Sequence, residues 1–258
     1  MQTVPQKTLI IGHTGRMGQM LMTLAQAKTL DVLGIDQPLA PETLNLSDVE
    51  LAIFCVPALV LEQVLTKVCP YLPRDCIVAD ITSVKERPMQ QMERVWGGMV
   101  VGTHPLFGPS LGPKEDLTVA ITQGRKASAE AIAKTEGFFQ TLGFKIFHCD
   151  VKTHDLAMAS LQNLNFITTV AYFALLAGHK EFLPFLTPSF LRRLKAAKKM
   201  LTEDAPMFTG LFEANNNSQS LVRQYSKLLN LAAAGDIEVL CHRAQWWVDY
   251  DHEDRDGL

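Results

Sequence analysis

The chain has 258 residues, a formal net charge of −3 and 47% hydrophobic residues, so it is long enough for one large domain or two ordinary ones. This charge balance argues against a general binder of nucleic acid or acidic membranes. No run approaches the roughly 20 apolar residues of a membrane span, the first residues do not resemble a signal peptide, and five scattered cysteines favour a cytoplasmic protein with reduced thiols.

Short β-rich runs alternate with amphipathic, helix-like segments over the first 150 residues. The expected strands are 8–11, 32–35, 51–56, 77–81, 99–102, 118–122 and 145–148. The expected helices between them include 17–28, 59–68 and 127–142. This alternation predicts an α/β fold of the Rossmann type, a doubly wound and mostly parallel sheet with helices on both faces. We therefore assign residues 1–150 to a dinucleotide-binding domain.

The remaining residues, 151–258, carry no strand-like runs and are expected to form an all-α domain. The expected helices are 154–178, 188–202, 206–231 and 236–249. The first of these is apolar nearly all round, which predicts burial on every side. The other helices are too few to enclose it, so we expect two subunits to pack together in a homodimer, with this domain also contributing to the substrate site.

A glycine-rich loop, "GHTGRMG", follows the first expected strand and opens a helix. Glycines at Gly12, Gly15 and Gly18 permit a tight turn and let the backbone approach a pyrophosphate, while the helix N-terminus offers N–H groups to the phosphates. Thr14 stands where the usual fingerprint has its middle glycine. A glycine-rich turn with no ligand is the alternative interpretation.

An acidic residue, Asp36, ends the next strand 18 residues after Gly18. An acid at this position can accept hydrogen bonds from an adenosine ribose and would repel a 2′-phosphate, which favours NAD over NADP. Arg16 keeps NADP open, because an arginine in this loop can also face a phosphate. The residues expected to bind the cofactor are Gly12, Thr14, Gly15, Arg16, Met17, Gly18, Asp36, Val56 and Pro57.

Three further segments lie where strands end, and ligands of open α/β sheets bind beyond the carboxyl ends of the strands. "FCVPA" (54–58) would line the nicotinamide side, "ADITSVK" (79–85) offers Ser83, and "GTHPLFGPS" (102–110) offers His104. A histidine here can take a proton from a substrate hydroxyl at neutral pH. Ser83 can hold the same oxygen or orient the imidazole, so both residues are candidate catalytic and substrate-binding groups.

Each of these residues also has a structural interpretation. The two glycines and two prolines of 102–110 predict a rigid loop without regular structure, in which His104 could simply bond a carbonyl group. Ser83 could be a helix N-cap, since "SVKE" fits a capping box with Glu86, and Lys85 is expected to be a solvated helix residue. His148, Cys149 and His154 match no zinc spacing, so no metal is expected.

Four motifs, "GHTGRMG", "VPALVLEQVL", "DITSVKERP" and above all "GTHPLFGPS", resemble the prephenate dehydrogenase family, also called cyclohexadienyl dehydrogenases. "THDLAM", "LTP", the segment 204–225 and "WWVDY" resemble its dimerisation region, so the resemblance covers essentially the whole chain. It implies NAD-dependent oxidative decarboxylation of prephenate to 4-hydroxyphenylpyruvate in tyrosine biosynthesis. His104 would then bond the 4-hydroxyl group and take its proton as hydride leaves, with Ser83 in support.

The chain departs from this family in two places. A stretch that carries a histidine in many members is "QNLNF" (162–166) here, and the stretch that carries a carboxylate-binding arginine is "NNNS" (215–218). An amide does not replace a bidentate charged pair at equal strength. The candidate replacements are Asn216, Asn217, Arg223, Arg192 and Arg193.

Three other functions stay open. The asparagines could suit arogenate, whose oxidation gives tyrosine. "GxxGRMG" also occurs in dihydrodipicolinate reductases, although the all-α second half and the lack of an adjacent His-His motif count against them. A dinucleotide-binding regulator that lost the substrate arginine is the non-enzymatic alternative.

Overall fold

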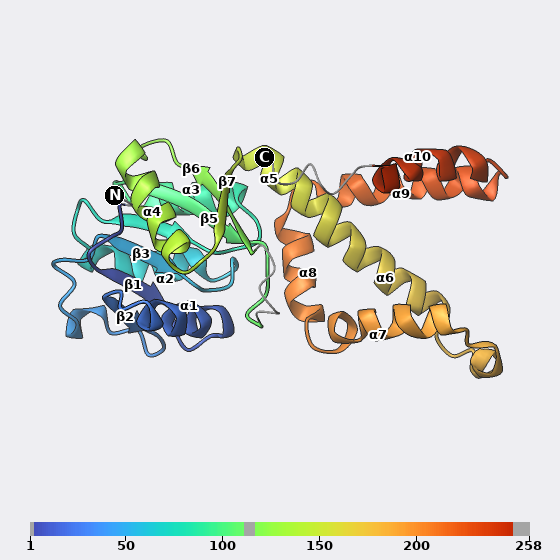
Figure 1. Cartoon of the computed structure of the whole chain (residues 1–258), viewed down its shortest axis with the longest axis horizontal. Helices are drawn as coiled ribbons and strands as arrows, with labels where there is room; N and C mark the ends of the chain where they lie inside the picture. Colours follow the sequence, from blue (N-terminus) through green and yellow to red (C-terminus); the bar gives the residue numbers. More distant parts are fainter. Residues whose placement is uncertain (1–2, 111–116, 250–258) are drawn as a thin grey trace.

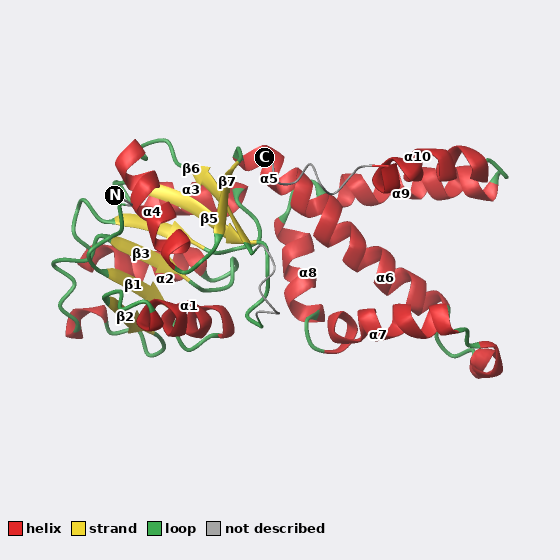
Figure 2. Ribbon diagram, in the orientation of Figure 1, coloured by secondary structure: helices red, strands yellow, loops and turns green. Residues whose placement is uncertain are grey.

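The protein is described by a computed structural model that covers residues 3–110 and 117–249. The sheet and its covering helices form one end of the molecule, and a purely helical part extends from it (Figure 1, Figure 2). The α/β fold expected from the sequence is therefore confirmed, and so is the all-α second half. In the described residues, no helix combines the length and apolarity needed to cross a membrane.

The described residues form one seven-stranded sheet in the order β2-β1-β3-β4-β5-β6-β7. The strands are β1 (Thr8–Ile11), β2 (Val32–Ile35), β3 (Leu51–Phe54), β4 (Ile77–Asp80), β5 (Val100–Pro105), β6 (Thr118–Gln123) and β7 (Lys145–His148). All neighbouring strands are parallel except β5 and β6, which pair antiparallel. The sheet is thus mostly parallel, as predicted.

Helices cover both faces of the sheet because its central strands are apolar on both sides. The helices are α1 (Arg16–Ala27), α2 (Leu61–Val68), α3 (Glu86–Val95) and α4 (Ala129–Thr141), with 3₁₀ turns at Pro41–Thr43 and Cys69–Tyr71. Ile10 packs into a buried cluster with residues of α1 and α4, whereas its neighbours Leu9 and Ile11 pack with α2 and α3. Alternation along one strand therefore supplies two separate cores.

The order in which strands are added to the sheet reverses at β1, which lies between the parallel strands β2 and β3, and the loops after β1 and β3 meet there. Gly12 has φ +83°, and a Cβ atom on it would lie 2.5 Å from the carbonyl oxygen of Cys55. Only glycine satisfies both the positive φ and this close approach. This reversal is the position at which open α/β sheets bind ligands.

The helical part begins directly after β7. It contains α5 (Val151–Met158), a π-helical turn (Ala159–Asn163), α6 (Leu164–Leu175), a 3₁₀ segment (Lys180–Phe185), α7 (Pro188–Thr202), α8 (Ala205–Ala214), α9 (Ser218–Ala233) and α10 (Ile237–Asp249). The expected single helix 206–231 is wrong, because the chain turns at Asn215. The side-chain oxygen of Asn215 accepts the N–H of Asn217 at 3.0 Å, a local bond that competes with helix formation. The domain boundary at residue 150 stays a prediction.

The expectation of an irregular loop from Gly102 onward is also wrong for its first residues. Strand β5 continues to Pro105, because β6 runs back beside it and pairs His104 with Ala120 and Pro105 with Val119. Proline is tolerated there because it is the last residue of the strand. His104 therefore lies within a buried strand.

Replacing Gly18 by alanine is expected to lower the free energy of unfolding by about 1–3 kcal/mol, because overpacking against a fixed backbone has no room to relax. The new Cβ would lie 2.2 Å from the carbonyl oxygen of Gly12. Gly108→Ala is the matched control, since a Cβ there meets nothing within 4 Å. Urea denaturation of both variants measures the difference, and equal stability would contradict the packing described for this loop.

Candidate active site

The glycine loop is tied to the end of β2 through Asp36. One carboxylate oxygen of Asp36 accepts the backbone N–H (3.0 Å) and the hydroxyl of Thr14, and the other accepts the N–H of Gln37 at 2.8 Å. Partial burial alone would raise the pKa of Asp36, but the hydrogen bonds from Thr14 and Gln37 outweigh it and lower the pKa. Asp36 is therefore an ionised acceptor beside the loop, as a ribose site requires.

The N-terminus of α1 is open to an anion. Gly15 occupies the N-cap position without a side-chain hydrogen bond, and the first turn of the helix carries no acidic residue. Arg16 begins this helix with an exposed side chain, Met17 packs on the core, and both follow the loop directly. Free N–H groups, absent side chains and a nearby cation are the features that a pyrophosphate needs.

Arg16 also reaches the helical part of the molecule. Its guanidinium nitrogen Nη1 lies 3.5 Å from Oδ1 of Asp204, at the start of α8, and Lys199 Nζ lies 3.0 Å from the other oxygen. Val56 and Pro57 follow β3 next to the same loop, half-buried and exposed respectively. The structure therefore brings all the predicted cofactor residues to one edge of the sheet.

His104 belongs to a chain of buried side chains. Its Nδ1 lies 3.0 Å from Nε2 of His154, and Nδ1 of His154 lies 2.8 Å from Oδ1 of Asp155. His154 and Asp155 are on α5, so the chain connects the end of β5 to the helical part. Among the described residues, Nε2 of His104 has no hydrogen-bond partner, so this atom is available to a ligand.

The carboxylate of Asp155 also caps helix α3. It accepts the backbone N–H of Lys85 at 2.6 Å and that of Glu86 at 2.9 Å. The predicted capping box on Ser83 is therefore wrong, because a carboxylate 70 residues away occupies the place of the local hydroxyl. Ser83 lies half-buried after β4, where it borders the end of β5: Asp80 pairs with Gly102, two residues before His104.

Lys85 is fully buried, which corrects the expectation of a solvated residue. Its Nζ bonds a carboxylate oxygen of Asp80 at 2.5 Å and the carbonyl oxygen of Thr103 at 2.7 Å. A Cβ on Gly102 would lie 3.1 Å from Cδ of Lys85 and 2.2 Å from the hydroxyl oxygen of Thr122. The glycine of "GTH" thus leaves room for the lysine stem.

This environment favours an uncharged imidazole. Burial lowers the pKa of His104 well below its ordinary value of 6.5, and electrostatic interaction with Lys85 and with the neighbouring imidazole of His154 acts in the same direction. Burial also lowers the pKa of Lys85, against the opposing attraction of Asp80. His104 is therefore a neutral base at physiological pH.

The asparagine turn "NNN" lies against this cluster. Buried Asn215 donates from Nδ2 to the carbonyl oxygen of Asp155 at 2.7 Å, and Asn216 donates to Glu86 at 3.0 Å. Asn217 holds the N-cap position of α9, and Arg223 is exposed on that helix. The predicted substrate residues Asn216 and Asn217 thus lie beside the start of α3, whereas Arg223 is further along the helical part.

Sequence reasoning missed His154, Asp155, Lys85 and Asn215. "THDLAM" contained the first two, but His154 was weighed only as a metal ligand. His148, its neighbour in that interpretation, pairs with Glu136 at 2.8 Å on the surface instead. No metal-binding group of three or more His, Cys, Asp or Glu side chains occurs in the described part of the chain.

Comparisons with known proteins point to one family. The family model described as the prephenate dehydrogenase nucleotide-binding domain matches residues 23–148, which begin after the glycine loop. The T-protein of Enterobacter agglomerans is 29% identical over 260 residues, which cover 96% of this chain and 68% of that protein. A probable arogenate/prephenate dehydrogenase of Methanocaldococcus jannaschii is 34% identical over 135 residues, or 51% of this chain and 30% of that protein.

Solved structures share the fold. Prephenate dehydrogenase from Aquifex aeolicus, in complex with hydroxyphenyl propionate and NAD+, has a TM-score of 0.77 at 18% identity and covers 95% of this chain and 98% of its own. Synechocystis arogenate dehydrogenase has a TM-score of 0.74 at 21% identity and covers 97% and 99%. The prediction of a dinucleotide cofactor is thus confirmed at the level of a nucleotide-binding domain.

Lys85→Met is expected to lower the free energy of unfolding by about 3–5 kcal/mol, because it leaves the buried carboxylate of Asp80 without its cation. The double variant Lys85→Met, Asp80→Asn removes both charges and should recover much of this loss. Urea denaturation at pH 7 compares the two with the parent chain. A double variant no more stable than Lys85→Met would contradict the buried ion pair.

Proposed function

Because this chain belongs to the prephenate dehydrogenase family of oxidoreductases, we propose that it oxidises and decarboxylates prephenate with NAD+ to give 4-hydroxyphenylpyruvate in tyrosine biosynthesis. The observation that carries the proposal is His104, a neutral buried imidazole at the end of a strand whose Nε2 is left for a ligand. The scattered free thiols suit a cytoplasmic enzyme.

The chain fits the cofactor it would need. Gly12, Gly15 and Gly18 permit the tightly packed turn that leads into α1, the N-terminus of α1 is uncapped, and Asp36 is an ionised acceptor for ribose hydroxyls. The same carboxylate would repel a 2′-phosphate, so NAD is preferred over NADP. When bound, NAD+ supplies the acceptor for the hydride.

His104 would work as a general base. Its Nε2 would take the proton of the substrate 4-hydroxyl group as hydride leaves the carbon that bears it. Loss of this proton pushes electrons toward that carbon, and release of the ring carboxylate as CO2 makes the ring aromatic. Ser83, at the neighbouring strand end, would hold the same hydroxyl oxygen.

Residues of the helical part would bind the second carboxylate of the substrate or its side chain. Asn216 and Asn217 lie on the turn that packs against Asp155, and Arg223 follows on α9. Amide groups are weaker carboxylate ligands than arginine. Arogenate carries an amino acid side chain, which amide groups could bind, and it is therefore the second candidate substrate.

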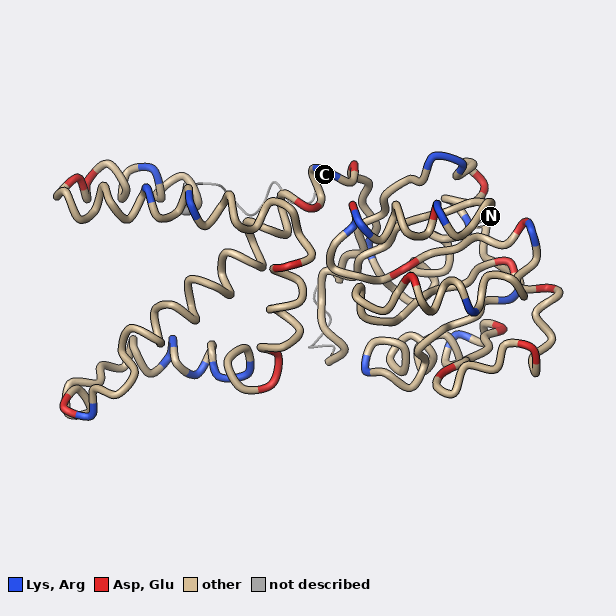
Figure 3. The backbone as a smooth tube through the Cα atoms, turned by 180° about the vertical axis from the view of Figure 1, so that it is seen from behind, with Lys and Arg blue, Asp and Glu red and all other residues tan. Residues whose placement is uncertain are grey.

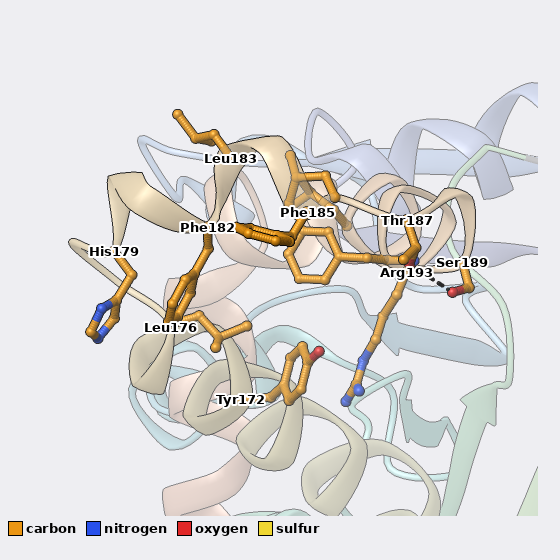
Figure 4. Close-up of a pocket in the computed structure, with 12 residues that line it drawn as sticks. Tyr172, Leu176, His179, Phe182, Leu183, Phe185, Thr187, Ser189 and Arg193 are labelled. Carbon is orange, nitrogen blue, oxygen red and sulfur yellow. Dashed lines mark hydrogen bonds between the residues drawn. The ribbon is translucent and has the colours of Figure 1, made fainter.

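The helical part would form a homodimer. Helix α6 carries no charged residue, which its uniformly tan tube shows (Figure 3), and Phe166 is its one buried residue, so its other apolar side chains stay half-buried or exposed. An apolar cavity of about 670 Å³ lies between α6 and α7, with Phe182 and Phe185 at its wall and Arg193 stacked 3.7 Å from the Tyr172 ring (Figure 4). A second copy would bury this surface.

The aromatic residues of "WWVDY" belong to the same argument. Trp246 and Trp247 are more than half exposed on α10, so they are not part of the core of this chain, and an interface role remains the proposal. Tyr250 lies outside the described residues.

Catalysis is tested by NADH absorbance with prephenate and with arogenate, each with NAD+ and NADP+. We expect turnover with prephenate and NAD+, and a loss of about 10²–10⁴-fold in kcat for His104→Asn with the fold intact by circular dichroism. Because its pKa is lowered, His104 stays unprotonated as the pH falls to 6.5, so kcat should decline only below that pH. Full turnover by His104→Asn would contradict the role of this residue.

The assembly is tested by light scattering of Leu175→Glu. Leu175 is 77% exposed at the end of α6, so a charge there does not disturb the protomer but would oppose an apolar interface. We expect a dimeric parent chain and a monomeric variant. Tyr71→Glu, an exposed position in the nucleotide-binding half, is the matched control and should stay dimeric. A monomeric parent chain would refute the proposal.

A further inference from the structure

His154 and Asp155, two neighbouring residues of α5, connect His104 to the helical part of the molecule. The proposed reaction has so far given them no role. The two side chains are buried, and they continue the line from His104 away from the substrate edge of the sheet. We propose that His154 and Asp155 are positioning residues that fix the tautomer of His104 and hold the substrate proton during turnover. This inference rests on the proposed function.

The protonation of this line follows from Asp155. Its two oxygens accept the N–H groups of Lys85 and Glu86, at 2.6 and 2.9 Å, so it is held as an ionised acceptor at the N-terminus of α3. An ionised carboxylate has no proton to give. The 2.8 Å contact to His154 therefore requires the proton on Nδ1 of His154.

The tautomer of His104 follows in turn. A neutral imidazole carries one proton, so Nε2 of His154 is then bare and accepts. The 3.0 Å contact requires Nδ1 of His104 to donate. His104 is neutral because burial and nearby positive charge lower its pKa, so its second nitrogen, Nε2, is bare. Two hydrogen bonds thus leave a lone pair on Nε2 of His104, which has no hydrogen-bond partner in residues 3–110 and 117–249.

The proposed reaction also needs a place to keep the proton. Oxidation of prephenate by NAD+ with loss of CO2 releases no net proton, because the hydroxyl proton is needed again on the phenol oxygen of the product. A base must therefore take this proton as hydride leaves and return it after CO2 has left. Release to solvent between these steps would serve no purpose.

The pair supplies that place. When Nε2 of His104 takes the hydroxyl proton, Nδ1 of His104 passes its own proton to Nε2 of His154. The positive charge then lies on His154, next to the Asp155 carboxylate, instead of on His104 near Lys85. As CO2 leaves, the electrons of the broken carbon–carbon bond make the ring aromatic, the oxygen becomes phenolate, and both protons move back.

The groups around His104 leave few other acceptors for its proton. The charged and titratable groups packed around it are Asp80 on β4, Lys85 and Glu86 at the start of α3, Cys149 before α5, and the pair itself. Lys85 cannot accept a proton while it is charged and paired with Asp80. Asp80 is occupied by that lysine, which leaves His154 as the acceptor in contact with His104.

Kinetic tests distinguish a role of His154 in positioning His104 from a role only in stabilising the fold. In His154→Ala, His104 is free to adopt either tautomer, and we expect a fall of roughly 10–100-fold in kcat with little change in KM, which is smaller than the roughly 10²–10⁴-fold contributed by the acid–base group itself. In His154→Gln, the amide oxygen can still accept from Nδ1 of His104, so part of the activity should return. Its acid limb should lie at higher pH than that of the parent chain, because the interaction with the His154 imidazole that helps to lower the pKa of His104 is gone.

Asp155→Asn gives the sharpest kinetic prediction. An amide nitrogen in the place of Oδ1 loses the N–H of Lys85 and donates to Nδ1 of His154, while the amide oxygen in the place of Oδ2 still accepts the N–H of Glu86. This reverses both imidazoles and places a proton on Nε2 of His104, so kcat should fall at least as far as in His154→Ala. His148→Gln is the matched control: it changes an exposed histidine that is also paired with an acid, and activity should be unchanged.

Nitrogen-15 NMR of the parent chain tests the tautomer without any turnover. We expect protonated Nδ1 and bare Nε2 for both His104 and His154 at pH 7.5, assigned by loss of signals in His154→Gln and His104→Asn. A protonated Nε2 on His104, or Asp155→Asn with the activity of the parent chain, would overturn the inference. Lack of turnover in the parent chain with the expected NMR result would instead refute the proposed function alone.

Discussion

The arrangement of the site depends on the hydrogen bonds that the carboxylate of Asp155 accepts. It accepts three hydrogen bonds, two from the first backbone N–H groups of α3 and one from His154, and the backbone carbonyl of the same residue accepts Asn215. Buried charge is stable only when it is paired and hydrogen-bonded. The nucleotide-binding half, α5 and the turn between α8 and α9 are therefore held together at one residue, and His104 is oriented through it.

A second buried charge shapes the other side of the histidine. Lys85 reaches under β5 to Asp80 and the carbonyl of Thr103, so the residue before His104 is fixed by a charged donor. Gly102 is needed because a side chain there would meet the lysine stem and Thr122. The motif "GTHP" can thus be understood residue by residue: glycine makes room, threonine is bonded, histidine is presented and proline ends the strand.

Local signals sufficed for the sheet and for the cofactor loop. Strands at 8–11, 32–35 and 145–148 were predictable to the residue, because short β-rich runs end at polar or glycine residues, and the loop after β1 followed from three glycines and Asp36. Lys85 could not be predicted, because a lysine beside a helix start is usually solvated and only the fold brings Asp80 and Thr103 to it. The capping of α3 by Asp155 was equally inaccessible, since its partners are 70 residues apart.

In the proposed reaction, one active site couples hydride transfer to loss of the ring carboxylate. The most direct test measures NADH and CO2 together, with prephenate labelled by carbon-13 in its ring carboxylate and deuterium on the carbon that bears the hydroxyl. We expect one labelled CO2 and one deuterated NADH for each 4-hydroxyphenylpyruvate formed. Reduced cofactor without labelled CO2, or labelled CO2 without deuterium in the cofactor, would contradict it.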